Sequence, residues 1–405
     1  MERLVSVLGL FVLLGIAFLL SDNRSKIQWR TVLSGVALQI SFGLLILKTS
    51  FGRSIFDGAG RVFSSILNYT SEGAGFIFGG LASPSNSVGF IFATMVLPTI
   101  IFMSALMSVL YHLGIMQKVV EVVAKIMMKV MKVSGAESLA AAANIFVGQT
   151  EAPLVIKPYV GTMTRSEIMC LMSGGMATIA GGVLAAFVGF GIDAGHLLAA
   201  SVMSAPAAIV CAKLLIPETE ESQTAGMVKL HLPKVATNVI DAAASGSSEG
   251  LKLAVNVAAM LLSFIALIAM LNGLLGWGGS FVGLPQLSFE YVVGHLFAPV
   301  AWLLGCPWED CLTVGNFLGK KLILNEFVAY LDLKEQMPNL SQRSVTLSTY
   351  ALCGFSNFSS IAIQVGGIGT LAPEKRPIIV KLGIRSLIAG TLACLMTAAI
   401  AGILV

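Results

Sequence analysis

Long apolar stretches separated by short polar ones run through nearly the whole chain. A helix needs about 20 apolar residues to cross the hydrocarbon core of a lipid bilayer. Eight stretches approach that length, at residues 4–20, 32–49, 88–112, 167–190, 195–216, 252–277, 344–366 and 382–404. We predict a membrane-spanning helix in each. The first is expected to be retained, because Arg3 is the only basic residue before it and no small-residue cleavage site follows.

Residues 117–134 follow a different pattern, in which charge recurs at helical spacing. Every third or fourth residue on one side is charged, and the other side carries Val, Ile and Met. The charged residues are Lys118, Glu121, Lys125, Lys129 and Lys132. A helix with one charged and one apolar face is typical of a helix that lies in the membrane interface.

Two further apolar stretches, 139–159 and 308–331, are interrupted at their centres by polar phrases. The first phrase is Gly148-Gln149-Thr150-Glu151-Ala152-Pro153, and the second is Asn325-Glu326-Phe327-Val328-Ala329-Tyr330. Each half is too short to cross a bilayer alone, which predicts re-entrant hairpins whose tips are buried in protein or line an aqueous cavity. The alternative for the first stretch is an ordinary helix kinked at Pro153.

The order of hairpin, broken helix and closing helix occurs twice. In the first half, Gly148–Glu151 is followed by the Gly-rich run Ser173–Gly182, and in the second, Asn325-Glu326 is followed by Cys353–Gly367. The first hairpin is expected to enter from the inner side and the second from the outer side. Inverted repeats with discontinuous helices are the layout of secondary transporters.

Composition agrees with this pattern, since 56% of the 405 residues are hydrophobic and only 11% are charged. Soluble domains carry about 25% charged residues. We therefore predict an all-α integral membrane protein with about eight transmembrane helices, two inverted re-entrant hairpins, interfacial helices, and broken helices at the midplane. The net charge of +4 is small and dispersed, which does not support nucleic-acid binding. No CxxC spacing indicates a zinc site, and no cofactor is expected.

Basic residues predict the orientation. They cluster at 21–31, 113–138 and 367–381, whereas the loop at 191–197 has none. With eight spans, this asymmetry predicts that both termini face outward. Lys320 and Lys321 fall on the outward side, and the pattern gives no account of Lys320.

Glu72 is expected in a polar outer loop. The pattern also divides the chain into parts. We expect scaffold helices at 1–112, an interfacial helix at 113–137, a first transport repeat at 138–216, a cytoplasmic linker at 217–251, a scaffold helix and an extracellular-side helix at 252–306, and a second transport repeat at 307–405.

Glu151 and Glu326 are the main candidates for chemistry, because a carboxylate at bilayer depth costs about 2.5–3.5 kcal/mol on insertion scales. Ionised carboxylates can accept hydrogen bonds from a pair of hydroxyls, and the Gln149 amide suits the edge of a heterocycle. Asn357 and Ser360 share one helix face. The alternative for each acid is a structural ion pair, for instance with Lys157 or Lys321.

Neutral oxygens near the first broken helix could replace the water around a small cation. The candidates are the side chains of Asn144 and Thr178 and the carbonyls near Val147 and Ile179. The alternative for the two side chains is an interhelical hydrogen bond, worth about 0.6 kcal/mol on average.

Two other classes compete with a carrier. One is an intramembrane enzyme that uses the paired carboxylates. A nucleotide-binding enzyme is not supported, because the phrase Gly315–Lys321 falls one residue short of a P-loop and lacks the following Ser or Thr. A channel would show neither saturation nor accumulation against a gradient.

The chain resembles the concentrative nucleoside transporter family, of the bacterial, sodium-coupled type, along nearly its whole length. Asn144–Val155 looks like the family's first hairpin tip, Asn325–Tyr330 like its second, and Cys353–Ile361 like its broken seventh helix. The resemblance implies a homotrimer in the bacterial inner membrane that imports uridine-like nucleosides with sodium by an elevator movement. Proton-driven relatives depart from the Gln-Thr-Glu-Ala-Pro wording at residues 149–153, which this chain keeps.

The resemblance also implies roles for individual residues. The base would face Gln149, Thr150 and Glu151, with Val183 and Phe355 as apolar walls. The ribose hydroxyls would be bound by Glu326, Asn357 and Ser360. Sodium would be bound by Asn144, Thr178 and the carbonyls of Val147 and Ile179, and Thr178 keeps the hydroxyl of the Ser found in a close relative.

Overall fold

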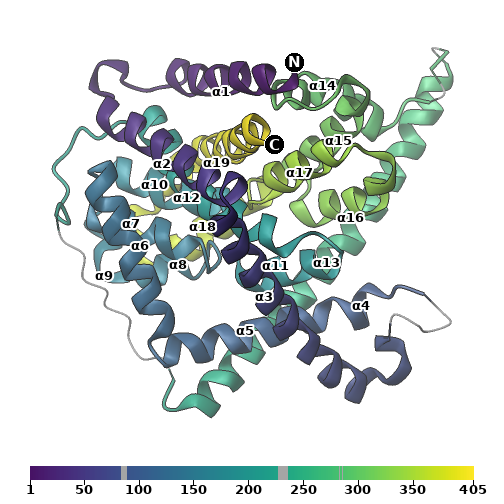
Figure 1. Cartoon of the computed structure of the whole chain (residues 1–405), viewed down its shortest axis with the longest axis horizontal. Helices are drawn as coiled ribbons and strands as arrows, with labels where there is room; N and C mark the ends of the chain where they lie inside the picture. The colour runs from purple at the N-terminus through teal and green to yellow at the C-terminus, as the bar shows by residue number, and fades with distance from the viewer. Residues whose placement is uncertain (84–88, 227–235, 282, 285) are drawn as a thin grey trace.

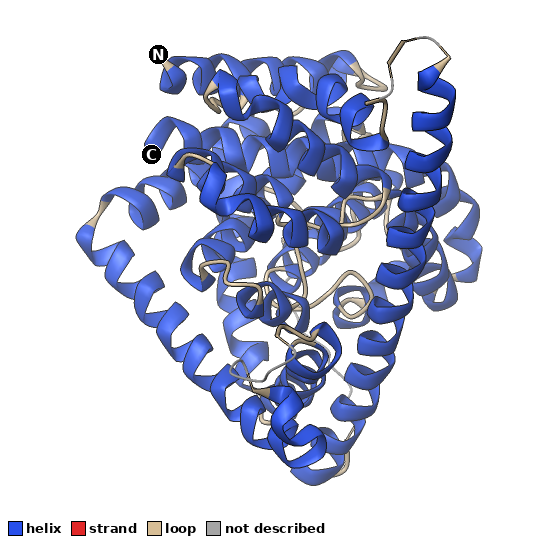
Figure 2. Ribbon diagram, turned by 90° about the vertical axis from the view of Figure 1, so that its right-hand side faces the viewer, coloured by secondary structure: helices blue, strands red, loops and turns tan. Residues whose placement is uncertain are grey.

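The regular elements of the protein are helices. A computed structural model describes residues 1–83, 89–226, 236–281, 283–284 and 286–405, and within these ranges no strand occurs (Figures 1 and 2). Seven helices in the described ranges are long and apolar enough to cross a membrane. They are Glu2–Leu19, Trp29–Lys48, Phe92–His112, Arg165–Gly189, Ala194–Leu215, Val239–Ser280 and Pro373–Leu404. The predicted all-α membrane class is confirmed.

The N-terminal part contains a helix that the apolar pattern missed. Between α2 (Trp29–Lys48) and the pair α4 (Phe92–Met95) and α5 (Leu97–His112) lies α3, which runs from Ser50 to Phe78. The prediction that Glu72 lies in a polar loop is therefore wrong, because Glu72 is an exposed residue of α3. This segment mixes apolar residues with Arg53, Asp57, Arg61 and Glu72, so its average hydropathy hides the helix.

The charged helix forms as the spacing predicted. It is α6 (Ile115–Met131), and its buried side consists of Met116, Val120, Ala124, Met127 and Met131. Its lysines are exposed, and Lys125 pairs with Glu121 one turn earlier at 2.5 Å. The helix is amphipathic, as an interfacial position requires.

Two groups of helices repeat the same order. The first is α7 (Gly135–Asn144), α8 (Ala152–Val155), α9 (Lys157–Val160), α10 (Arg165–Ala177), α11 (Gly181–Gly189) and α12 (Ala194–Leu215). The second is α15 (Cys311–Ile323), α16 (Glu326–Gln336), α17 (Gln342–Leu352), α18 (Phe358–Leu371) and α19 (Arg376–Leu404). The alternative of one helix kinked at Pro153 is wrong, because helix α7 already ends at Asn144.

The helix α13 (Val239–Ser280) begins earlier than its apolar run suggested. The prediction of a linker through residue 251 is wrong for residues 239–251, and residues 227–235 lie outside the described ranges. Gly246 and Gly250 let this polar stretch pack against α5. A Cβ on Gly246 would lie 2.7 Å from the Ser104 carbonyl oxygen, and one on Gly250 would lie 2.8 Å from Ile101 Cα. Small residues four apart allow α13 and α5 to pack closely. After α13 comes α14 (Phe289–Leu303).

The two broken helices meet at their breaks. The first break separates α10 from α11 at residues 178–180, and the second separates α17 from α18 at residues 353–357. The Phe355 amide donates to the Thr178 carbonyl at 3.2 Å, which joins the two unwound segments. A Cβ on Gly354 would lie 2.9 Å from the Met176 carbonyl oxygen and 2.6 Å from Cys394 Sγ. Only glycine permits this close crossing.

A buried ion pair ties the first hairpin to α12. Lys213, near the end of α12, pairs with Glu137 in the first turn of α7, and both side chains are buried. Lys213 Nζ also donates to Ser166 Oγ at 2.9 Å and to Glu218 Oε2 at 3.4 Å. A buried pair of this kind is costly to break one side at a time.

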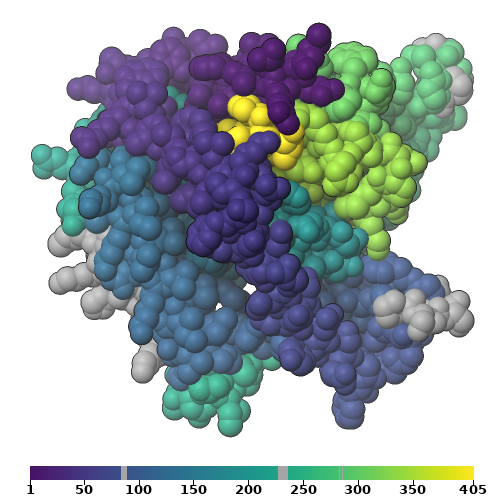
Figure 3. All heavy atoms as spheres, viewed as in Figure 1, coloured from purple at the N-terminus to yellow at the C-terminus, as the bar shows by residue number. Residues whose placement is uncertain are grey.

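The two ends of the described chain lie together. Arg3 Nη2 donates to the Val405 carbonyl oxygen at 2.5 Å, so α1 (Glu2–Leu19) packs beside α19. Figure 3 shows these helices in purple and yellow on the same face.

Candidate functional site

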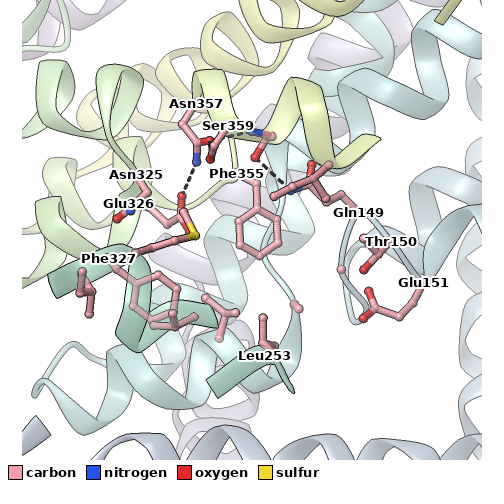
Figure 4. Close-up of a pocket in the computed structure, with 18 residues that line it drawn as sticks. Gln149, Thr150, Glu151, Leu253, Asn325, Glu326, Phe327, Phe355, Asn357 and Ser359 are labelled. Atoms are coloured by element: carbon pink, nitrogen blue, oxygen red, sulfur yellow. Dashed lines mark hydrogen bonds between the residues drawn. The ribbon is translucent and has the colours of Figure 1, made fainter. Parts of the chain in front are cut away.

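One cavity collects residues from both repeats. It holds about 670 Å³ of empty space, its opening included, and lies between the hairpin tips, the broken helices and α13 (Figure 4). All of the residues predicted to bind solute line it: Gln149, Thr150, Glu151, Val183, Glu326, Phe355, Asn357 and Ser360. The sequence placed them in two groups more than 140 positions apart at their nearest, from Val183 to Glu326, and the fold brings them together. Their roles in binding stay a prediction.

The tip of the first hairpin forms one polar side of the cavity. Gln149 is buried, whereas Thr150 and Glu151 are exposed. Gln149 Nε2 donates to Ser360 Oγ at 2.9 Å, which links the first hairpin to the start of α18. This side therefore offers amide, hydroxyl and carboxylate groups within a few residues.

The second hairpin forms the opposite polar side. Glu326 is the first residue of α16, where the helix dipole favours a negative charge. Asn357 Nδ2 donates to Glu326 Oε2 at 2.9 Å, while Asn357 Oδ1 caps α18 by accepting from the Ser360 amide at 2.9 Å. One asparagine thus positions both the carboxylate and the Ser360 backbone.

Apolar side chains separate and enclose these two polar sides. In Figure 4, Phe355 lies between the group Gln149–Glu151 and the group Asn325–Phe327. The helix α13 supplies Leu253, Val257, Met260 and Leu261 as a further wall. Sequence reasoning missed this wall, because an apolar side chain on a spanning helix gives no local sign of the cavity it faces. The other lining residues it missed are Gly148, Ala180, Asn325, Phe327, Ser359 and Ile363.

The predicted cation ligands lie beside the first broken helix. The Gly181 amide donates to the Phe146 carbonyl at 3.1 Å, which holds the end of α7 against the break. Asn144 is 1% exposed, and neither its Oδ1 nor its Nδ2 has a hydrogen-bond partner in the described part of the chain. An amide buried without partners is costly, and a cation bound by Oδ1 would give that oxygen a partner. Thr178 Oγ1 donates to the Gly174 carbonyl at 2.9 Å and keeps its lone pairs available. The carbonyls of Val147 and Ile179 flank these groups in sequence.

The ion-pair alternative for the two acids fails. Among the described residues, no ion pair within 4.0 Å includes Glu151 or Glu326. Lys321 Nζ instead donates to the Ala351 carbonyl at 2.8 Å.

Lys320, which the sequence left unexplained, is an ion-pair residue. Its Nζ lies 2.5 Å from Asp332 Oδ2 on α16 and 3.1 Å from Glu290 Oε1 on α14. It therefore joins the two arms of the second hairpin to each other and to the neighbouring helix.

Comparison with known proteins agrees with the resemblance. Models of the Na+ dependent nucleoside transporter N-terminus and C-terminus match residues 8–81 and 196–402, and a gate model described as nucleoside recognition matches residues 93–194. The uncharacterized transporter YutK of Bacillus subtilis (strain 168) is 47% identical over 406 residues, which cover 100% of both chains. Rat sodium/nucleoside cotransporter 1 is 43% identical over 420 residues, and the match covers 100% of this chain and 64% of the rat protein.

Solved structures agree in fold. CNTnw in an inward-facing substrate-bound state superposes with a TM-score of 0.95 at 44% identity, covering 100% of this chain and 98% of CNTnw. A CNTnw variant in an outward-facing state gives a TM-score of 0.95 at 43% identity, with the same coverage. The named relatives are transporters and not enzymes, so the enzyme alternative is dropped. The chain belongs to the Na+-dependent nucleoside transporter family.

Proposed function

We propose that this protein imports nucleosides by symport with sodium. The observation that carries the proposal is the single cavity on which polar groups from both repeats converge, with a carboxylate from each hairpin. Membership of a family described as Na+ dependent nucleoside transporters supports the same solute and the same ion.

The two polar sides of the cavity match the two ends of a nucleoside. The amide and hydroxyl of Gln149 and Thr150, together with Glu151, bind the base, while Phe355 and Val183 enclose its ring. Glu326 accepts hydrogen bonds from ribose hydroxyls, and Asn357 and Ser360 complete that side. Carboxylates accept hydroxyl hydrogens and donate none, which makes Glu326 selective for a sugar over an anion.

Sodium binds between the end of α7 and the first break in this proposal. The ligands are Asn144 Oδ1, Thr178 Oγ1 and the carbonyls of Val147 and Ile179. The unpartnered Asn144 amide supports this assignment. Because Thr178 precedes Ala180 and Val183, which line the cavity, a cation at the break would order the wall that the nucleoside contacts.

Alternating access proceeds by an elevator movement of the two repeats against α13. The polar groups that face the cavity come from the repeats, whereas α13 contributes Leu253, Val257, Met260 and Leu261. The repeats can therefore slide past α13 without breaking a hydrogen bond to the solute. The inward-facing and outward-facing structures of CNTnw support such a movement in a relative.

A homotrimer in the bacterial inner membrane, with both termini outward, belongs to the same proposal. The family resemblance supports the trimer, and the distribution of basic loops supports the orientation.

Uptake of radiolabelled uridine into proteoliposomes tests the coupling. We expect accumulation when sodium is higher outside than inside, and collapse of that accumulation when the sodium gradient is dissipated. The alternative is proton coupling, and accumulation that follows an imposed pH gradient while ignoring sodium would establish it instead. Passive equilibration with neither accumulation nor saturation would indicate a channel.

A further inference from the structure

Gln364 is a buried amide directly behind the cavity. It lies on α18, and Asn357, Ser360 and Gln364 follow one another at helical spacing on the same face. Gln364 Nε2 donates to Gln149 Oε1 at 3.0 Å and to the Met172 carbonyl at 3.0 Å. Its side chain is 1% exposed, and it does not line the cavity.

The local packing is built around this contact. A Cβ on Gly175 would lie 2.7 Å from Gln364 Nε2 and 2.8 Å from Gln149 Cβ. A side chain at position 175 would therefore push the two amides apart. Glycine at this point of α10 leaves the room in which they meet.

The contacts fix which way each amide points. A backbone carbonyl accepts and never donates, so Met172 requires the NH2 end of Gln364. The second hydrogen of that NH2 group then goes to Gln149, whose oxygen must face it. The NH2 end of Gln149 is left to donate to Ser360 Oγ. A chain of three hydrogen bonds thus begins at a backbone atom and ends at two side chains that line the cavity.

We propose that Gln364 is a positioning residue that sets base selectivity by holding the Gln149 amide in one orientation. The inference rests on the proposed function, because it requires that Gln149 faces the base. With its orientation fixed, Gln149 presents its remaining N–H and its remaining lone pair at defined places. A free amide could rotate by half a turn and exchange donor for acceptor.

The bases of nucleosides differ in which positions on their edges are hydrogen-bond donors and which are acceptors. Uracil offers an N–H donor and a carbonyl acceptor where cytosine offers an acceptor and an amino donor. Hypoxanthine and adenine differ in the same way. A site that is built to pair with one pattern leaves a buried group unpaired when the other pattern enters. Gln364 therefore distinguishes the members of each pair without touching them.

Two substitutions test the proposal. Gln364→Met removes both donors, and Gln364→Glu supplies at most one hydrogen where two are needed. For the wild type and both variants, uptake of uridine, cytidine, inosine and adenosine into proteoliposomes gives Vmax/KM for each. We expect the uridine/cytidine or inosine/adenosine ratio to move towards one by about tenfold in both variants, which is the range of one misplaced hydrogen bond.

A matched amide elsewhere provides the control. Gln39 is fully buried, and its Nε2 donates to Thr397 Oγ1 at 2.9 Å between α2 and α19, away from the cavity. Gln39→Met should leave both ratios unchanged. Melting temperatures in detergent identify any variant that fails to fold, and the other variant then carries the test.

The outcomes separate this inference from the function on which it rests. Equal loss for all four nucleosides, with unchanged ratios, would overturn the positioning role and leave a structural one. Wild-type ratios within about twofold of one would also overturn it, because a fixed amide must discriminate by more than that. Absence of any nucleoside uptake by the wild type would defeat the proposed function itself.

Discussion

Replacement of Glu326 by Gln removes one charge from the site and changes little else in shape. Glu326 is 3% exposed, and its Oε2 accepts from Asn357 Nδ2 at 2.9 Å. A glutamine can keep that bond through its own oxygen, so the hairpin should stay in place. In glutamine an NH2 group replaces the second carboxylate oxygen, so that position can no longer accept a hydrogen bond from a ribose hydroxyl.

The magnitude follows from the bond that is lost. A hydrogen bond to a charged group contributes about 1.5–3 kcal/mol, and about 1.4 kcal/mol corresponds to a factor of ten. We therefore expect Glu326→Gln to lower Vmax/KM for uridine by about 10- to 100-fold. Uridine uptake into proteoliposomes measures it. The control is Glu72→Gln, the same change at an exposed residue of α3, which should alter uptake by less than about twofold.

Deoxynucleosides show whether the loss arises at the sugar. If Glu326 accepts from a ribose hydroxyl, removing that hydroxyl and substituting Glu326 should not be additive. The variant should then discriminate between uridine and its 2′-deoxy or 3′-deoxy analogue less than the wild type does. Equal effects of Glu72→Gln and Glu326→Gln, or unchanged discrimination against both analogues, would refute the reasoning.

Three further predictions concern the ion site and the packing of the two repeats. Asn144→Leu should abolish the sodium dependence of uridine uptake. It should not lower the melting temperature in sodium-free detergent, because the buried amide has no hydrogen-bond partner among the described residues to lose. A lower melting temperature without sodium would favour a structural hydrogen bond. Gly354→Ala should cost about 1–3 kcal/mol of stability by overpacking the crossing. The control is Gly73→Ala, which should cost nothing by packing because no atom outside its own helix turn lies within 4 Å of the added Cβ. Equal melting temperatures for the two variants would contradict the close crossing. Lys213→Met should destabilise the protein by about 3–5 kcal/mol, because Glu137 stays buried and unpaired. Adding Glu137→Gln should recover part of that loss. A double variant that is less stable than Lys213→Met alone would contradict this account.

The spanning helices could be predicted from the sequence where apolar residues are continuous. The run at 382–404 forms the main part of α19. The run at 344–366 is interrupted at residues 353–357, which form the break between α17 and α18. α3 and the first turns of α13 could not be found in this way. Their helices carry charged or small residues, and their stability comes from packing against other helices, as Gly246 and Gly250 do against α5. Local hydropathy does not record such contacts.

The site was predicted to the extent that its residues are polar within apolar sequence. Glu151 and Glu326 stand out by their cost in a membrane, and Asn357 and Ser360 by their spacing. Gln364 continues that spacing and could have been included. The apolar wall from α13 could not, because Leu253 and Val257 look like any other lipid-facing residues until the fold places them at the cavity. The role of Lys320 could not be predicted either, because its ion-pair partners, Asp332 and Glu290, come close to it only in the folded protein.

Entry of radioactive sodium driven by uridine tests the central claim most directly. In proteoliposomes without a sodium gradient, an inward uridine gradient should drive sodium uptake by the wild type, and Glu326→Gln and Asn144→Leu should greatly reduce it. Sodium entry that is independent of uridine, or uridine entry that brings no sodium, would contradict symport through this site.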